Sequence, residues 1–276
     1  MKKLLVLGLM LCALLAPVEA SATIALVSNY FNSNANSTTV VSGSISTTGA
    51  SLIVVTCTSA YTISSVSNSG TADSWNLLAD YGGSNVGYTR MAYAYAPTTS
   101  SSQTFTCTFS SSASQHYNTI TVLAVSGTMT TSGVLRTSVG LNDSGSTSVS
   151  PGSITPSIVG ELIVSSAIGA DSISELCTSV TTPTSFTSLG NICGANAVYN
   201  PAAAGYYIPS STSTVTPTWV FNNAAGAHAA SEMAAFCPAS GCTAPSYGFP
   251  GFIRSSLDFD FDPYNLWKFQ GEHHAA

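Results

Sequence analysis

The chain repeats itself at a spacing of about 112 residues, and this feature limits its fold most strongly. The segment YAYAPTTSSSQTFTCTF at 93–109 resembles GYYIPSSTSTVTPTWVF at 205–221, and HYNTITVLAVSG at 116–127 aligns with HAASEMAAFCPA at 228–239. A fixed internal period indicates two copies of one structural unit. The repeat therefore predicts two related halves, at about 49–127 and 160–239.

Each half consists of short strand-like runs separated by Ser, Thr, Gly, Asn and Pro clusters, a pattern typical of all-β proteins. In the first half the runs lie near 51–57, 73–80, 88–96, 103–110 and 117–125. In the second half they lie near 161–168, 184–190, 195–208, 215–222 and 229–237. The segment 141–157 between the halves carries the apolar Ile154, which a surface linker does not require. We therefore expect a jelly-roll-like β-sandwich over 21–238, built from two related five-strand halves that share one core.

The succession of motifs also resembles a known group. ISSVSNSGTADSWNLLA, MAYAYAP, QTFTCTF and NTITVLAVSG, followed by GELIVSSAIGA and a closing EMAAF, are similar to secreted bacterial and phage-associated jelly-roll domains. The resemblance covers about 24–238 and lies in strand patterning and turns. It implies a β-sandwich but no particular chemistry, because the group has no agreed activity. The cysteines and the C-terminal extension depart from the pattern of the group.

Residues 1–20, MKKLLVLGLMLCALLAPVEA, have the composition of a secretory signal peptide. Two lysines precede an apolar run from Leu4 to Leu15, and small residues stand at the expected cleavage site after Ala20. No later apolar stretch is long enough to span a membrane. We expect a mature protein that is extracellular or at the cell surface, with the periplasm as an alternative.

Removal of 1–20 leaves four basic and eleven acidic residues. This balance argues against nucleic acid as a partner, because its phosphates need clustered Lys and Arg. Solubility must then come from Ser, Thr and Asn. Abundant threonine is also typical of the solvated faces of a sandwich.

The mature chain holds six cysteines, an even number that indicates disulfides in an exported protein. Sequence order alone leaves fifteen pairings open, and thiolate binding of a metal is an alternative without paired CxxC motifs to support it. From the strand positions of the repeat we expect three pairs, with the first on neighbouring strands. These pairs are Cys57–Cys107, Cys177–Cys193 and Cys237–Cys242.

Residues 239–276 form a C-terminal extension outside the repeat. In LDFDFD, alternation places Asp258, Asp260 and Asp262 on one face of a strand, where carboxylate oxygens could bind calcium; the alternative is a half-buried strand with a solvated acidic face. The adjoining DPYNLWKFQG at 262–271 predicts one short helix. The extension either covers the sandwich or docks on another molecule, including a second copy of the chain.

The stretch GAHAASEMAAF at 226–236 places a histidine and a glutamate on an alanine-rich strand. His228 and Glu232 share one face but lie roughly 13 Å apart at the usual rise per residue. His228 corresponds in the repeat to His116, so a two-fold relation of the halves would bring both to one metal or ligand site; the alternative is two surface histidines. For Glu232 we expect a structural ion pair with Arg90 or Arg136.

No motif identifies a catalytic site. The chain has no GxSxG nucleophile elbow, and we expect it not to be an enzyme. A glycoside hydrolase, which needs two carboxylates across a cleft, is the least favoured alternative. Its candidate carboxylates are Asp73, Asp80, Asp171, Glu175 and Glu232.

Two non-catalytic functions remain. The favoured one is a secreted structural or adhesive module that contacts an extracellular polysaccharide or another surface protein, with docking through the C-terminal extension. The other is a lectin-like carbohydrate-binding module whose aromatic rings stack on sugars. The rings expected to do so are Tyr93, Tyr95, Tyr206, Tyr207 and Trp219. No cofactor is expected, apart from the calcium considered above.

Overall fold

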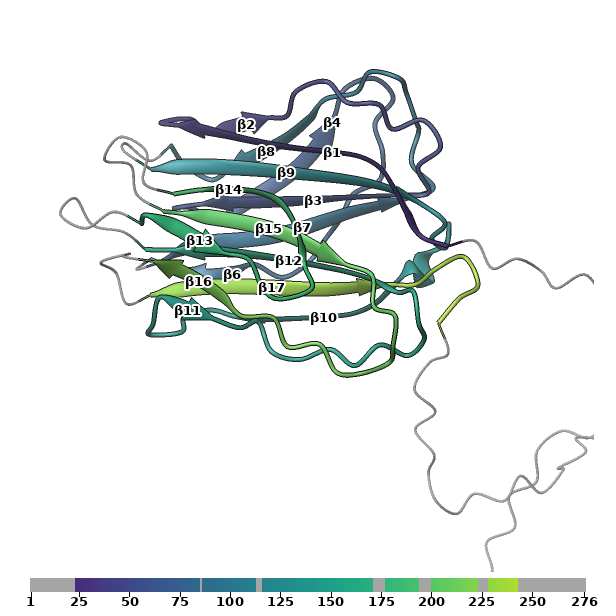
Figure 1. Ribbon diagram of the computed structural model, residues 1–276. Coiled ribbons are helices and arrows are strands. Elements are labelled where there is room, and N and C mark those ends of the chain that lie inside the picture. Colours follow the sequence, from purple (N-terminus) through teal and green to yellow (C-terminus); the bar gives the residue numbers. More distant parts are fainter. Residues whose placement is uncertain are drawn as a thin grey trace, which may run out of the picture. The chain divides into compact units, whose positions relative to one another are not determined.

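The structure of the protein, a computed structural model, describes residues 23–84, 86–112, 116–170, 177–193, 200–222 and 228–242. These residues form an all-β fold of antiparallel strands with a single 3₁₀ turn, Ser132–Val134 (Figure 1). None of them belongs to a helix long and apolar enough to cross a bilayer. The expected signal peptide, acidic alternation at Asp258, Asp260 and Asp262, and helix at 262–271 lie outside the described residues.

The first half folds into a large and a small antiparallel sheet. Its strands are β1 (Ala25–Ala35), β2 (Thr39–Val41), β3 (Leu52–Ser59), β4 (Ile63–Asn68), β5 (Asn76–Leu77), β6 (Tyr81–Gly83), β7 (Gly87–Tyr95), β8 (Phe105–Phe109) and β9 (Tyr117–Ser126). The first large sheet has the order β1-β9-β3-β7-β5, with β6 also paired to β7. The first small sheet has the order β2-β8-β4. The chain thus passes repeatedly between two sheets, as in a jelly roll.

The second half repeats these two strand orders. Its strands are β10 (Leu135–Leu141), β11 (Ser148–Val149), β12 (Leu162–Gly169), β13 (Ser179–Thr181), β14 (Thr187–Ile192), β15 (Ala202–Tyr207), β16 (Trp219–Asn222) and β17 (Ala229–Phe236). The second large sheet has the order β10-β17-β12-β15-β14 and the second small sheet the order β11-β16-β13. The equivalence of the orders in the two halves confirms the all-β sandwich of two related halves that the repeat predicts.

The four sheets stack in layers, with the two large sheets in the centre (Figure 1). Alternate residues of β3 point to opposite sides: Leu52 and Val54 pack against the second large sheet, whereas Ile53 and Val55 pack against the first small sheet. The core between the large sheets contains residues of both halves, including Leu123 and Phe236. A strand covered on both faces cannot alternate apolar with charged residues, which explains the continuous apolar and small runs of β3, β12 and β17.

Several strands went unrecognised in the sequence. These are β1 and β10, which lie at the edges of the large sheets, the short β6, and β2, β4, β11 and β13 of the small sheets. About half of their residues are Ser, Thr, Asn or Gly and few of their side chains are buried, so they resemble the turns between strands. Threonine, conversely, is not confined to solvated faces. Thr58 and Thr119 are buried between the large sheets, where their hydroxyls lie 2.7 Å apart.

The three expected disulfides are present, with Cα atoms separated by 6.1, 5.2 and 5.3 Å in chain order. One detail of the prediction is wrong. Cys57 on β3 and Cys107 on β8 do not lie on neighbouring strands of one sheet; their disulfide joins the first large sheet to the first small sheet. Both cysteines are fully buried, because they face each other across the core of the first half.

The first and the last described segments of the chain both contact the segment that joins the two halves. Gly127 has a φ of +78°, and a side chain there would collide with the backbone of Thr23. The carbonyl of Gly127 accepts a hydrogen bond of 2.7 Å from the amide of Ala239, and Thr128 forms a bridge with Pro238. The entry and the exit of the folded unit therefore lie close together.

Candidate functional site

Two of the five rings expected to stack on sugars are buried. Trp219 is fully buried and its Nε1 donates a hydrogen bond of 3.0 Å to Ser165 Oγ. Tyr93 is 7% exposed and makes an edge contact with Phe236 between the large sheets. The assignment of these two rings to a sugar platform is wrong, because Trp219 lies inside the core of the second half and the second large sheet covers Tyr93. Tyr95 and Tyr206 are half-buried against the same central core.

Tyr207, the fifth ring, lines a surface groove of about 340 Å³, here named the Tyr207 groove. Its other residues come from the turn before β14 and from the segment between β15 and β16. They are Pro183, Thr184, Ser185, Phe186, Ser211, Ser213, Thr214, Val215, Thr216, Pro217 and Thr218. The ring centroids of Phe186 and Tyr207 are 5.7 Å apart and their planes are tilted by 38°. The two rings make a shallow corner.

A tight turn places Phe186 beside the groove. The amide of Phe186 donates a hydrogen bond of 3.1 Å to the carbonyl of Pro183. Ser185 has a φ of +73°, a left-handed conformation that glycine adopts at least cost. A serine in this conformation therefore carries backbone strain, and its side chain lines the groove.

The opposite wall of the groove is fixed by pairs of hydroxyls. Val215 forms an isolated β-bridge with Ile154, with two backbone hydrogen bonds of 2.8 and 3.0 Å. Thr214 Oγ1 lies 2.7 Å from the hydroxyl of Thr155, and Thr216 Oγ1 lies 2.8 Å from that of Ser153. Among the lining residues none carries a charged side chain. The groove thus offers hydroxyls, two rings and prolines in a neutral setting.

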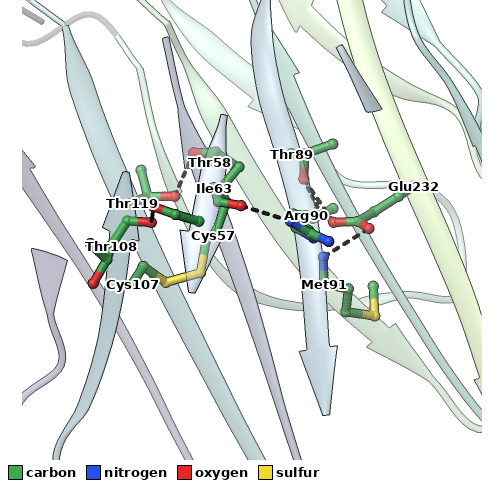
Figure 2. Close-up of a disulfide and its surroundings, with 12 residues drawn as sticks. Cys57, Thr58, Ile63, Thr89, Arg90, Met91, Cys107, Thr108, Thr119 and Glu232 are labelled. Atoms are coloured by element: carbon green, nitrogen blue, oxygen red, sulfur yellow. Dashed lines mark hydrogen bonds between the residues drawn. A yellow bond between two sulfur atoms is a disulfide. The ribbon is translucent and has the colours of Figure 1, made fainter. Parts of the chain in front are cut away.

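A second notable cluster surrounds Glu232, which reaches from β17 across the space between the large sheets to β7 (Figure 2). One carboxyl oxygen accepts hydrogen bonds from Thr89 Oγ1 at 2.9 Å and Ser166 Oγ at 3.0 Å. The other accepts the amide of Met91 at 2.9 Å. Burial raises the pKa of Glu232 to about 8, although these hydrogen bonds oppose the shift.

The expectation that an arginine pairs with Glu232 is wrong. Arg90 donates to the carbonyls of Leu78 and Ile63 at 2.7 Å and lies 3.4 Å from Asp80. Arg136 instead forms an ion pair of 2.8 Å with Glu161, at the start of β12. Neutral hydroxyls and an amide can satisfy a buried carboxyl, particularly one whose pKa favours the protonated form.

The two histidines have different partners. His116 Nδ1 bonds Asn200 Oδ1, and Asn200 in turn donates to the carbonyls of Val86 and Gly169. His228 Nδ1 lies 2.9 Å from an exposed carboxylate oxygen of Asp143. Over the described ranges, no three His, Cys, Asp or Glu residues form a cluster able to hold a metal ion. Nothing in these contacts brings His116 and His228 to one site.

Three of the carboxylates considered for glycoside hydrolysis lie in the described part of the chain, and all three have partners in the fold. Asp73 accepts the amide of Thr98 at 2.7 Å, and Asp80 pairs with Arg90. Burial raises the pKa of Asp80, while the Arg90 charge opposes that shift. Glu232 is 2% exposed and closed off between the sheets. Asp171 and Glu175 lie outside the described residues.

Comparison with protein-family models, with curated proteins and with solved structures gave no match. The site must therefore be interpreted from its own chemistry. Of the groove residues, sequence reasoning named only Tyr207. Phe186 and the hydroxyls of 211–218 lie in a Ser/Thr/Pro-rich segment and its neighbouring turn, which carry no signal beyond that of an ordinary loop.

Proposed function

We propose that the protein is a secreted structural or adhesive module that acts by binding and not by catalysis. The Tyr207 groove carries this proposal. Its lining supplies hydroxyls, aromatic rings and prolines, which suit binding, but no carboxylate, imidazole, thiol or amine that would serve as a general acid, base or nucleophile.

Secretion is part of the proposal. The signal-like segment 1–20 supports it, and the three disulfides are compatible with an oxidising compartment. Membership of the secreted bacterial and phage-associated jelly-roll group is also proposed, on the sequence motifs alone, and it adds no activity.

The test is an adhesion assay on the mature chain, residues 21–276. The chain is mixed with insoluble polysaccharide particles, with beads carrying a matrix protein and with beads carrying its own copies, and the pelleted fraction is measured. Soluble sugar in the supernatant is measured in parallel. Binding to at least one surface without sugar release is the expected result, whereas time-dependent release of sugar would contradict a non-catalytic function.

The C-terminal extension is proposed as a second docking element. A chain ending at Ala244 keeps Cys242 and its disulfide, and is the matched control. If the extension docks on other molecules, the shortened chain retains its fold but loses adhesion to the protein-coated beads. Equal adhesion of both chains would remove the extension from the proposal.

A further inference from the structure

We propose that the Tyr207 groove binds a neutral saccharide chain, with one sugar ring held in the corner of Phe186 and Tyr207. This inference rests on the proposed binding function and names the site and the class of its ligand. Four features support it: the lining of the groove, its rings, its equivalent in the first half and the strained turn.

The lining matches the chemistry of a neutral sugar. Seven serine and threonine side chains border the groove, and each hydroxyl both donates and accepts hydrogen bonds, as sugar hydroxyls do. None of the lining residues offers a cation to an acidic polysaccharide. The chain also has a formal net charge of −6, which disfavours an anionic ligand further. An uncharged ligand rich in hydroxyls is therefore favoured.

The two rings supply the apolar part of the site. Phe186 and Tyr207 remain partly exposed, unlike Trp219, and their centroids lie 5.7 Å apart. Because the planes are tilted by 38°, they form a corner and not a flat platform. Such a corner fits the apolar face of one sugar ring, while the hydroxyls along 211–218 face the neighbouring units.

At the equivalent position of the first half, a buried side chain takes the place of the groove lining. Val215 of the groove and Gln103 occupy equivalent bridge positions, paired with Ile154 and Ile45 respectively. Gln103 is 3% exposed, and its amide oxygen accepts the hydroxyl of Thr47 at 2.8 Å. A buried, hydrogen-bonded side chain therefore stands where the second half has a groove-lining valine.

The aromatic residues at the position of Phe186 also differ between the two halves. In the repeat, Trp75 corresponds to Phe186, but it packs edge-on against Phe105 with centroids 6.0 Å apart and donates to Asn68 Oδ1 at 3.1 Å. Both rings pack against the core of their own half, but Phe186 in addition lines the groove. The buried Gln103 and the ring contacts of Trp75 distinguish this part of the first half from the groove of the second, which favours a role for the groove in binding.

Ser185 adds an independent observation. A glycine would adopt its φ of +73° without strain, whereas serine retains a hydroxyl at the groove at a cost in backbone energy. Strained backbone positions gather at binding sites, where the surrounding structure maintains them. The replacement Ser185→Gly relieves the backbone strain and removes a groove hydroxyl. It should therefore weaken binding without lowering the stability of the fold.

The experiment titrates the mature chain by calorimetry with neutral hexasaccharides of glucose, xylose, mannose and N-acetylglucosamine. We expect binding of at least one of them. Tyr207→Ala should weaken that binding at least tenfold, and Ser185→Gly should weaken it several-fold with an equal or higher melting temperature. Tyr61→Ala removes a ring that is 38% exposed in the first half and should leave binding unchanged.

Other outcomes overturn the inference. Absence of binding to all four sugars, or binding that Tyr207→Ala and Ser185→Gly leave unchanged, removes the saccharide site. Tighter binding of an oligogalacturonate or of a proline-rich peptide assigns the groove to another ligand. If Tyr207→Ala does not fold, Ser185→Gly and the wild-type titration decide. Adhesion to protein-coated beads without sugar binding would leave the proposed adhesive function standing while this inference fails.

Discussion

Glu232 of the second large sheet accepts a backbone hydrogen bond from a strand of the first large sheet. On β7, Thr89 pairs with β6 and Ala92 pairs with β5, so Met91 lies between the two short edge strands. The carboxyl of Glu232, which belongs to the other half of the chain, accepts the amide of Met91. An unpaired buried amide is costly, so this contact helps to fix the two large sheets relative to each other.

The pKa of Glu232 predicts how stability depends on pH. A folded-state pKa of about 8, against 4.5 as the ordinary value, means that the folded protein holds a proton that the unfolded chain releases between these values. The contribution of Glu232 to stability is therefore complete below about pH 4.5 and declines as the pH rises towards 8.

Glu232→Gln tests this prediction, because the amide keeps the shape of the side chain without titrating; its Oε1 can accept the Met91 amide while its NH₂ donates to the hydroxyls of Thr89 and Ser166. We expect the free energy of unfolding of the variant, relative to wild type, to increase steadily from about pH 5 to about pH 8. The comparison cancels the other nearby groups, Asp80, Tyr81 and Arg90, which both proteins share. Parallel pH profiles in denaturant titrations would show that Glu232 is ionised in the folded protein.

Sequence reasoning placed Glu232 well but not its partners. Strand alternation places Ala234 and Phe236 on the face of Glu232 and Met233 and Ala235 on the other, and the two cores divide these four residues in the same way. The partners Thr89 and Met91 lie more than 140 residues away in the other half. The local sequence pattern contains no information on such a contact. The expectation from charge pairing named Arg90 and Arg136, which have other partners in the fold.

Among the secondary-structure elements, the extent of burial determines which strands can be recognised from the sequence. β3, β12 and β17 are buried along their whole length and stand out as apolar or small-residue runs. β10 is half-exposed, contains Arg, Thr, Ser and Gly, and has no such signal. Edge strands acquire their conformation from the neighbour that they pair with, so their sequences need little intrinsic preference.

The disulfides differ in the length of chain that they close. Cys57–Cys107 spans 50 residues and should stabilise by about 4 kcal/mol on the chain-entropy estimate, whereas Cys237–Cys242 spans 5 and should contribute about 2 kcal/mol. We expect the variant Cys57→Val/Cys107→Ala to melt well below Cys237→Val/Cys242→Ala in calorimetry. Equal melting temperatures would show that the covalent link between the first two sheets adds little to their shared core.

At the scale of the whole molecule, each half supplies one wall of the central core. Leu52, Leu123 and Phe236 are fully buried between the large sheets, and each such side chain contributes about 1.5–3 kcal/mol. A half on its own would expose its wall. The two halves should therefore not fold independently.

This can be tested with residues 21–128 and 129–276 as separate chains. We expect each alone to aggregate or bind a hydrophobic dye without a cooperative melting transition, and the two expressed together to form a soluble complex. The intact mature chain is the control. A monomeric half with a sharp melting transition would contradict the prediction and would make the halves separate domains.

The repeat predicted the sandwich and the shared core, but it did not predict the Tyr207 groove of the second half. Offset alignment pairs Tyr207 with Tyr95 and Phe186 with Trp75, and nothing in those letters shows that Phe186 and Tyr207 line a groove in addition to their packing contacts. The nearby bridge position holds Gln103 in one half and Val215 in the other, and their different surroundings appear only with the burial of each side chain.

The meeting of Thr23 and Ala239 at Gly127 has a mechanical consequence. Because the mature chain is expected to begin at Ser21, a pulling force would reach the folded unit from its C-terminal side. It would first load the hydrogen bond between Ala239 and Gly127 and the bridge between Thr128 and Pro238. These contacts would therefore break before the strands of the four sheets are stretched.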